Sequence, residues 1–406
     1  MENDGILSIR LDNWKAVKLK EVCSKIFSGG TPNTNKREYW NGNLPWLSSG
    51  ETNNRFIRRT KSSISEDGVE NSSTRLAHAR STVIASAGQG HTRGQASYLL
   101  IDTYINQSII ALFPRENLLD SRFLFYSLTP KYDRFRQISD DHSIRGSLTT
   151  RILAEEYIQM PPLKEQKAIS KILSDLDSKI ELNQQMNKTL ESIAQAIFKH
   201  WFIDFEFPDE NGQPYKSSGG EMVDSELGEI PKGWRVGRIE ELTNVSSGKR
   251  PLERSETRTE LFSVELIGAS SVMGYTKEPL INEKVIVIGR VGTHGVVQRT
   301  FGPSWPSDNT LIFSSTNTEY IFQCLKRIDY ESLNVGSTQP LITQTQLKKY
   351  QIIIPCKDIL EKFETTASIL YTKVFTNKLE LENLRVILDL LLHKLMSGKI
   401  RVPLEE

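Results

Sequence analysis

The chain contains few of the residues and motifs that reactive chemistry requires. Only three of its 406 residues are cysteines, and their isolated positions offer no paired spacing for zinc or for disulfides. The six histidines are equally scattered, without ligand spacing. No Gly-x-x-x-x-Gly-Lys-Ser/Thr loop, no His-Glu-x-x-His and no nucleophile elbow is present. These absences favour recognition over catalysis, so we expect no catalytic residue, no metal site and no cofactor bound by this chain.

Long apolar runs are also missing. No stretch approaches the ~18 consecutive apolar residues of a membrane-spanning helix. The N-terminus shows neither the basic start nor the apolar stretch of a secretory signal, so we expect a cytoplasmic protein without membrane contact. Hydrophobic residues make up 38% and charged residues 25% of a chain long enough for two domains with their own cores.

Net charge is nearly neutral, +1, but unevenly distributed. Residues 1–162 hold 21 basic against 17 acidic residues, residues 233–355 hold 14 against 12, and residues 206–232 hold 2 against 7. This balance is weaker than that of a protein that grips phosphates over its whole surface. Any nucleic-acid role must depend on local basic clusters, or on a partner that supplies most of the positive charge.

What the sequence does contain is an internal repeat. Residues 163–200 and 357–394 carry the same helical pattern at an offset of 194 residues. Apolar residues recur at alternating steps of four and three, which is the signature of a coiled-coil seam. The seam includes Leu176, Ile180, Asn183 and Leu190 in the first helix, and Leu370, Val374, Asn377 and Leu384 in the second. The two asparagines occupy equivalent seam positions, where a polar residue can fix register at a cost in stability, although partly exposed positions would explain them equally well.

The repeat extends upstream of each helix. A tryptophan-led strand pattern leads to Ser-Gly-Gly-Thr-Pro at 28–32 in the first copy and to Ser-Gly-Lys-Arg-Pro at 247–251 in the second. In each copy an apolar strand then runs into a Gly-rich turn, at 88–94 and at 289–295. Each copy is therefore expected to be a mixed α/β globule followed by a long helix. This predicts an α/β (α+β) fold built from a tandem duplication, with internal pseudo-two-fold symmetry.

Basic residues cluster in both copies. Arginine and lysine can bind phosphates or base edges, glutamine suits adenine, and glycine lets a backbone approach a ligand closely. An ordinary solvated face with core tryptophans would also account for the cluster in the first copy. The candidate nucleic-acid-binding residues are Lys36, Arg37, Gln89, His91, Arg93 and Arg145 in the first copy, and Lys249, Arg250, Arg290 and His294 in the second.

Four stretches resemble the specificity subunits of type I restriction-modification systems. They are PPLKEQKAI at 161–169, AIFKHWFIDF at 196–205, ELGEIPKGW at 226–234 and LMSGKIRV at 395–402, and the resemblance extends from Trp14 to the end. The second helix departs from the pattern, because it lacks the Pro-Leu-x-Glu-Gln of the first. The resemblance implies two target recognition domains, each followed by a long helix, with the helices packed as an antiparallel coiled coil. Such packing would bring Asn183 near Asn377.

The resemblance also implies a function. It implies a non-catalytic subunit that binds double-stranded DNA and reads a bipartite target, one half-site per recognition domain. Two methyltransferase subunits and translocase-nuclease subunits would be its partners, carrying S-adenosylmethionine, ATP and Mg²⁺ for adenine N6 methylation and DNA cleavage. The Asn/Asp-Pro-Pro-Tyr/Phe motif of amino-methyltransferases is indeed missing here. Two alternatives stay open: a duplicated coiled-coil scaffold without DNA reading, and a diverged DNA-modifying enzyme.

The expected boundaries follow from the repeat and the resemblance. They are residues 1–160 for the first recognition domain, 161–205 for the central helix, 206–232 for an acidic linker, 233–355 for the second recognition domain, and 356–406 for the C-terminal helix and tail. About 36 helical residues would span roughly 54 Å. That length suffices to hold two domains about one DNA turn, ~34–36 Å, apart.

Overall fold

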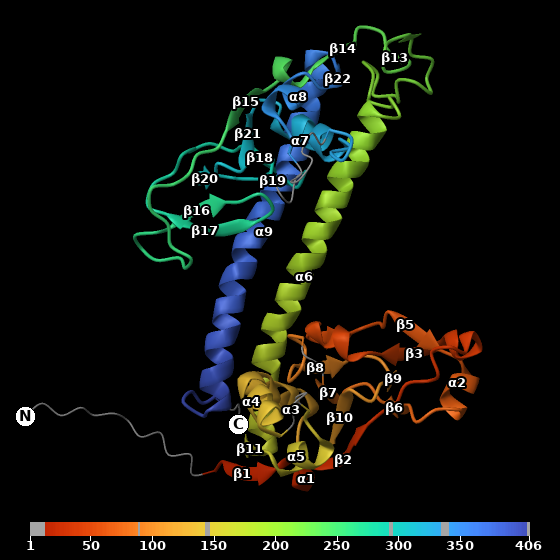
Figure 1. Cartoon of the computed structure of the whole chain (residues 1–406), viewed down its shortest axis with the longest axis vertical. Coiled ribbons are helices and arrows are strands. Elements are labelled where there is room, and N and C mark those ends of the chain that lie inside the picture. Colours follow the sequence, from red (N-terminus) through yellow and green to blue (C-terminus); the bar gives the residue numbers. More distant parts are fainter. Residues whose placement is uncertain (1–12, 88–89, 143–146, 292–294, 334–340, 404–406) are drawn as a thin grey trace, which may run out of the picture. The chain divides into compact units, whose positions relative to one another are not determined.

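The computed structural model describes residues 13–87, 90–142, 147–291, 295–333 and 341–403 (Figure 1). The chain forms two compact units: unit 1 comprises Met1–Leu182 with Leu381–Glu406, and unit 2 comprises Asn183–Glu380. Two 40-residue helices, α6 (Leu163–Phe202) and α9 (Lys357–Met396), each contribute one part to unit 1 and the other part to unit 2. No described helix combines the length and apolar character needed to cross a membrane.

Unit 1 contains two sheets and a strand pair. The first sheet has the order β2 (Cys23–Ser28), β10 (Ile109–Pro114), β7 (Thr82–Ala85), β8 (Ala96–Leu99) and β4 (Phe56–Ile57). Its neighbours are antiparallel except for β8 and β4. The second has the order β5 (Ser62–Ile64), β3 (Trp40–Leu47), β9 (Thr103–Ile105) and β6 (Arg75–Ala77), and β1 (Lys15–Lys18) pairs with β11 (Tyr157–Met160).

Short helices complete unit 1. They are α1 (Leu19–Val22), η1 (Arg37–Tyr39), η2 (Ser49–Asn53), α2 (Glu66–Glu70), α3 (Ser121–Leu128), η3 (Thr129–Lys131), α4 (Tyr132–His142) and α5 (Thr150–Glu155). Helix α3 is almost wholly buried, because its Phe-Leu-Phe-Tyr run is apolar on every side. Its aromatic residues join the sheet to the long helices in one hydrophobic core.

Unit 2 repeats this plan with smaller sheets and one more strand pair. Its main sheet has the order β15 (Asn244–Ser247), β21 (Thr310–Ser314), β18 (Ile286–Gly289) and β19 (Val297–Arg299). A second sheet has the order β17 (Val272–Thr276), β16 (Val264–Ile267) and β20 (Ser304–Pro306). The remaining elements are the pairs β12 (Met222–Val223) with β13 (Ile230–Pro231) and β14 (Arg235–Arg238) with β22 (Gln351–Ile354), and the helices η4 (Ile239–Glu241), α7 (Thr318–Lys326) and α8 (Gln344–Lys348). The predicted duplication is confirmed.

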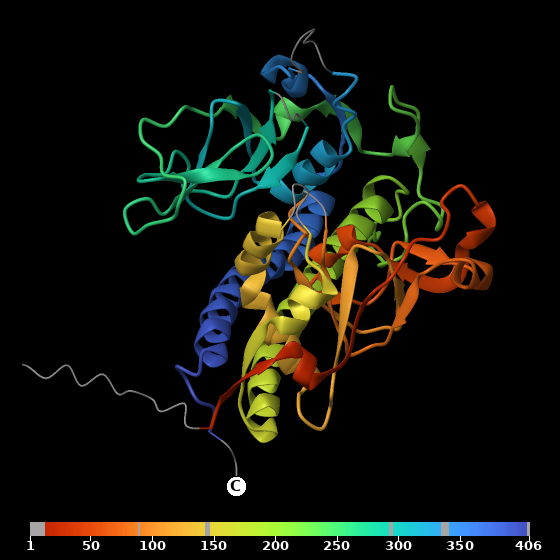
Figure 2. The ribbon, with the colours of Figure 1, turned by 60° about the horizontal axis from the view of Figure 1, so that its bottom comes forward.

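Within each unit, parts of α6 and α9 lie side by side (Figure 1, Figure 2). In unit 1, Leu173 near the start of α6 shares a core with Leu392 near the end of α9. In unit 2, Phe198 near the end of α6 packs against Phe363 near the start of α9, with ring centroids 5.9 Å apart. The start of each helix therefore meets the end of the other, and the predicted antiparallel packing is confirmed.

The predicted seam residues face this packing. Asn183, Val374 and Asn377 are buried, and Leu176, Ile180, Leu190, Leu370 and Leu384 are half-buried. Asn183 and Asn377 are both 0% exposed, so the alternative of partly exposed positions is wrong. Asn377 donates to Asn187 Oδ1 (2.9 Å), whereas Asn183 donates to Glu380 Oε2 (2.9 Å). Because a misaligned pairing would leave these amides buried without partners, the bonds favour one register.

In each unit an arginine that contacts aromatic rings helps to hold the globule against a long helix. In unit 1, Arg55 Nε lies 3.0 Å from Asp177 Oδ1 on α6, and Tyr126 donates a hydrogen bond of 2.7 Å to the same carboxylate. In unit 2, Arg299 lies between the rings of Phe322 and Tyr371, 3.8 and 3.7 Å from their centroids. Positions 177 and 371 are equivalent at the offset of 194 residues. Both units thus combine an ion pair with cation–π contacts at this site. The carboxylate lies on α6 in unit 1, whereas in unit 2 it belongs to Glu319 of α7, 2.9 Å from Arg299, and the long helix supplies the Tyr371 ring.

The first turn of α7 is capped by the long helix. The Glu364 carboxylate of α9 accepts hydrogen bonds from the backbone N–H groups of Glu319 (3.0 Å) and Tyr320 (2.7 Å). In unit 1, Asp120 caps α3 directly, and Ser170 of α6, at the position equivalent to 364, donates to Asp120 (2.7 Å). Burial raises the pKa of Glu364 to about 7, against the opposing effect of the two N–H groups.

We expect the stability of unit 2 to fall as pH rises from about 4.5 to about 7. The Glu364 pKa is higher in the folded chain than the ordinary value of 4.5, so the folded state keeps a proton that the unfolded chain releases. Glu364→Gln should remove up to ~3 kcal/mol of this pH dependence. Thermal unfolding from pH 4 to pH 8 measures it, with Glu361→Gln, an exposed position on the same helix, as the control. Parallel pH profiles for wild type and Glu364→Gln would contradict the assignment.

Candidate nucleic-acid interface

In each main sheet, two of the predicted loops and one further turn meet at one edge. Strands β2 and β7 both run antiparallel to the central strand β10, so they end where β10 begins, with Ser28 opposite Ile110 and Ala85 opposite Ile109. In unit 2 the same relation places the ends of β15 and β18 beside the start of β21. In unit 1 the loops after β2 and β7 and the turn before β10 therefore lie at the same edge of the sheet. In unit 2 the loops after β15 and β18 and the turn before β21 do the same.

Glycines fix the loop after the first strand of each sheet. A Cβ on Gly29 would lie 1.8 Å from the carbonyl oxygen of Ile105, and one on Gly248 would lie 2.1 Å from that of Ser307. Both separations are shorter than any tolerable contact, so the loop reaches this close approach only with glycine. The shared Ser-Gly at 28–29 and 247–248 is therefore an anchor for the loop that follows.

A tryptophan holds the next residue of each loop. Trp46 Nε1 donates to the Gly30 carbonyl (3.4 Å), and Trp305 Nε1 donates to the Lys249 carbonyl (2.7 Å). Gly30 and Lys249 are equivalent in the repeat, but Trp46 belongs to β3 and Trp305 to β20. The carbonyl at this position of the loop is thus held by a tryptophan in both units, but from a different strand in each. We call 29–37 and 248–254 the anchored loops.

The first anchored loop presents two of the predicted basic residues. Lys36 and Arg37 are both exposed. Lys36 Nζ donates to the Tyr39 hydroxyl (2.9 Å), and this hydrogen bond raises the lysine pKa, so the amine stays protonated at neutral pH. Within the described residues the Arg37 side chain has no ion pair, which leaves it available to an anionic ligand.

The Gly-rich turn of unit 1 differs from the expectation. His91 is exposed, and its carbonyl accepts a hydrogen bond from the Tyr132 hydroxyl (2.8 Å). Arg93, by contrast, is only 5% exposed and pairs with Asp140 Oδ1 of α4 at 2.6 Å. Arg93 is therefore not exposed as expected, because its side chain holds the turn against α4, and its contact with DNA stays a prediction. Three other candidates, Gln89, Arg145 and His294, lie outside the described residues.

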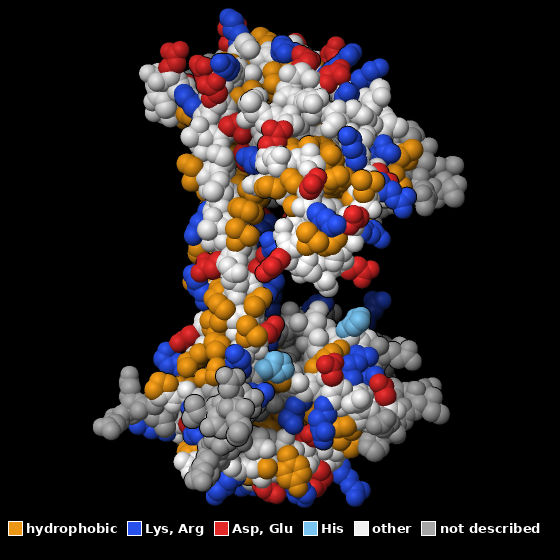
Figure 3. Space-filling model, turned by 90° about the vertical axis from the view of Figure 1, so that its left-hand side faces the viewer, with side chains coloured by type: hydrophobic (Ala, Val, Ile, Leu, Met, Phe, Trp, Pro, Cys, Tyr) orange, Lys and Arg blue, Asp and Glu red, His pale blue; other side chains and the backbone are white. Residues whose placement is uncertain are grey.

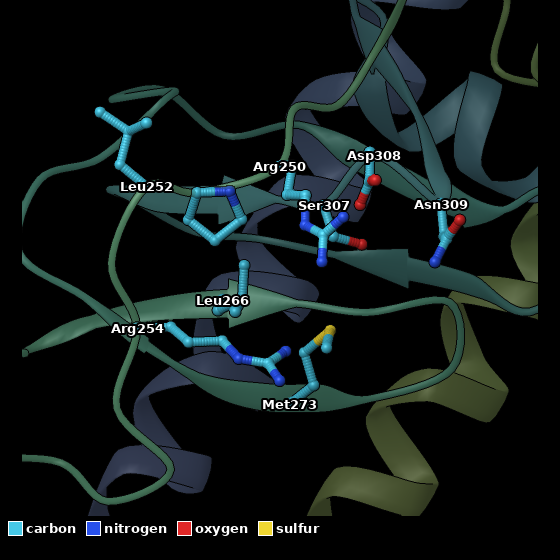
Figure 4. Close-up of a pocket in the computed structure, with 9 residues that line it drawn as sticks. Arg250, Leu252, Arg254, Leu266, Met273, Ser307, Asp308 and Asn309 are labelled. Atoms are coloured by element: carbon cyan, nitrogen blue, oxygen red, sulfur yellow. The ribbon is translucent and has the colours of Figure 1, made fainter.

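In unit 2, Lys249 and Arg250 are exposed, and Arg290 is half-buried. The Arg290 backbone N–H donates to the Asn309 carbonyl (3.0 Å), which joins the Gly-rich turn to the turn before β21. Arg250 and Asn309 line a pocket of about 420 Å³ on this edge (Figure 4). Its other lining residues are Pro251, Leu252, Arg254, Leu266, Met273, Ser307 and Asp308.

Sequence reasoning missed most of this pocket. Of its lining residues only Arg250 is among the predicted nucleic-acid-binding residues, and Arg254, Asp308 and Asn309 are not. One feature of the sequence could have indicated the pocket. Lys249, Arg250 and Arg254 cluster around Leu252, an apolar residue that no helical or strand pattern explains. Among the described residues, no three His, Cys, Asp or Glu side chains are placed to hold a metal ion.

Comparisons with known proteins agree with the duplication. The family described as "Type I restriction modification DNA specificity domain" matches residues 11–192 and 231–387. The type I restriction enzyme MjaIX specificity subunit of Methanocaldococcus jannaschii is 29% identical over 423 residues, covering 96% of this chain and 94% of the relative. The HindI specificity subunit of Haemophilus influenzae is 25% identical over 389 residues, covering 76% and 84%.

A solved structure shares the fold. The S subunit of a type I restriction-modification system from M. genitalium superimposes with a TM-score of 0.66 at 16% identity, covering 97% of both chains. Its similarity supports the architecture of two globules and two long helices.

We expect Gly248→Ala to destabilise the second anchored loop. Its added methyl group must displace the Ser307 carbonyl, at a cost of about 1–3 kcal/mol, as in other overpacked sites. Gly302→Ala is the matched control, because its Cβ would meet nothing within 4 Å and its φ is not positive. Thermal unfolding measures both variants, and equal melting temperatures would show that the close approach is not a constraint.

Proposed function

We propose that this chain, which belongs to the family of type I restriction-modification DNA specificity subunits, reads a bipartite DNA target with one half-site per globule. The observation that carries the proposal is the repeated sheet edge. Each globule has an anchored loop, with cations such as Arg37 and Arg250, beside a Gly-rich turn. Unpaired arginine and lysine side chains can contact both phosphates and base edges.

Duplication suits this function. A single small recognition domain cannot select one site among the ~10⁶ or more competing sites of a genome. Two linked domains multiply their selectivities, because the second contact becomes intramolecular once the first has formed. We propose that the paired helices α6 and α9 set the separation of the two half-sites.

The chain is a non-catalytic recognition component, so methyl transfer and cleavage require partners. We propose two methyltransferase subunits, which carry S-adenosylmethionine and methylate adenine N6, together with translocase-nuclease subunits that use ATP and Mg²⁺. Exposed apolar side chains on α9 are candidate contacts for the methyltransferases: Val386, Ile387 and Leu390 in unit 1, and Ile369 and Leu379 in unit 2. Figure 3 shows hydrophobic side chains, in orange, along the exposed face of the long helices. Such a patch marks an interaction surface when it is contiguous.

Exchange of residues 14–155 for the equivalent domain of a relative should change only one half of the DNA target. The reason is that each globule has its own sheets and its own anchored loop. Mapping of methylated adenines in cells that carry the chimaera measures the result, with the unaltered chain as the control. If both halves of the target changed, independent reading would be refuted. If no sequence-dependent methylation appeared with the unaltered chain, the result would favour the alternative of a duplicated coiled-coil scaffold without DNA reading.

We also expect Leu390→Ser to weaken methyltransferase binding about tenfold without loss of stability. Leu390 is exposed, so its replacement should change folding by no more than ~0.5 kcal/mol, while an apolar anchor buried on binding contributes 1–2 kcal/mol. Asp389→Ser, an exposed neighbour on the same helix, is the matched control. Titration calorimetry or co-purification with the methyltransferase gives the affinity, and equal affinities for the two variants would remove this face of α9 from the interface.

A further inference from the structure

The pocket of unit 2 gathers polar side chains that lack partners in the described part of the chain. Ser307 is only 3% exposed, yet its hydroxyl has no hydrogen-bond partner there. Its backbone is fixed, because its N–H donates to the Ile267 carbonyl (2.9 Å) and its carbonyl accepts from the Thr310 hydroxyl (2.7 Å). A buried hydroxyl without a partner is unfavourable, so its retention beside an open pocket points to a ligand that completes it.

The cations of the pocket are also available. Arg250 and Arg254 are exposed, and neither has an ion pair among the described residues. Glu253, the carboxylate between them in sequence, pairs instead with Lys277 (2.5 Å). Figure 4 shows the Arg250 side chain directed toward Ser307 and Asp308, and that of Arg254 toward Met273. Two guanidinium groups, a hydroxyl and the Asn309 amide therefore border one recess.

Apolar side chains share the recess. Leu252 is fully exposed at the rim, and Met273 is exposed on the opposite side. This mixture matches the chemistry of base edges in the major groove of DNA: arginine pairs with guanine O6 and N7, asparagine with adenine, a carboxylate with the cytosine amino group, and apolar groups with the thymine methyl. Asp308 would repel a phosphate, so the recess suits base edges better than the DNA backbone alone.

Unit 1 lacks this arrangement at the equivalent place. There the Thr31 hydroxyl donates to the side-chain oxygen of Gln107, the position equivalent to Asn309. The amide oxygen of Gln107 is therefore engaged within the first anchored loop, whereas the Asn309 side chain has no partner in the described residues. The two globules consequently offer different groups to DNA from the same sheet edge.

Resting on the proposed DNA-reading function, we propose that this pocket is the base-reading site of the second globule. Arg250 and Arg254 contact guanine edges there, Ser307 and Asn309 complete the hydrogen bonding of the same or the adjacent base pair, and Leu252 and Met273 pack against a thymine methyl group. Arg254, Ser307 and Asn309 are thereby specificity-determining residues of the second half-site.

The test uses the full chain assembled with its methyltransferase subunits and duplexes altered at each position of the second half-site. Arg254→Ala should relax selection at one base pair by about 5- to 150-fold, the usual range for loss of a bidentate base contact. Arg258→Ala is the matched control, because Arg258 is an exposed arginine of the same segment that does not line the pocket. It should leave the ranking of duplexes unchanged.

Ser307→Ala gives an independent measurement. Because the hydroxyl has no partner among the described residues, its removal should not lower the melting temperature, yet it should change discrimination at the same or a neighbouring base pair. Two results together would overturn the pocket assignment and leave DNA reading intact. Arg254→Ala would affect all duplexes uniformly and to the same extent as Arg258→Ala, and Ser307→Ala would leave discrimination unaltered. Failure of the unaltered complex to discriminate any duplex would refute the proposed function itself.

Discussion

The antiparallel pairing of α6 with α9 is the constraint on which the rest of the structure depends. Neither helix is a separate rod, because each contributes to the hydrophobic core of both units. In unit 1, Leu173 and Leu392 share a core with Phe123 of α3, and in unit 2, Phe363 packs with Tyr320 of α7 through Phe198 and Phe202. A shift of the helices would therefore disturb each globule as well as the seam between them.

Local repetition made much of this fold predictable. The alternating four-three steps identified both helices, and the apolar runs now seen as β7 and β18 identified one interior strand of each main sheet, because burial on both sides leaves a strong pattern. Contacts that depend on distant residues were not predictable. Arg93 is buried because Asp140, 47 positions away, lies against it. A seam pattern fixes the buried face of a helix but not its antiparallel alignment, so Asn183 could not be assigned to Glu380.

The two units show which features of the duplication are constrained by geometry. Trp46 and Trp305 hold the same carbonyl from different strands, and the caps of α3 and α7 come from Asp120 and from Glu364 on another helix. Both copies keep the position of the backbone, but different side chains hold it in place. The same backbone frame is therefore compatible with different side chains in the two anchored loops.

The division of the chain also has a consequence for its biosynthesis. Unit 2 is one uninterrupted segment, Asn183–Glu380, whereas unit 1 is closed by residues that follow it. Leu388, Leu392 and Leu395 belong to the core of unit 1, and Arg401 forms an ion pair with Glu165 at 2.6 Å. On the ribosome, where chains emerge from the N-terminus, the first globule to be made is thus the last to be completed. Until then the core of unit 1 lacks the leucines of α9 that complete it.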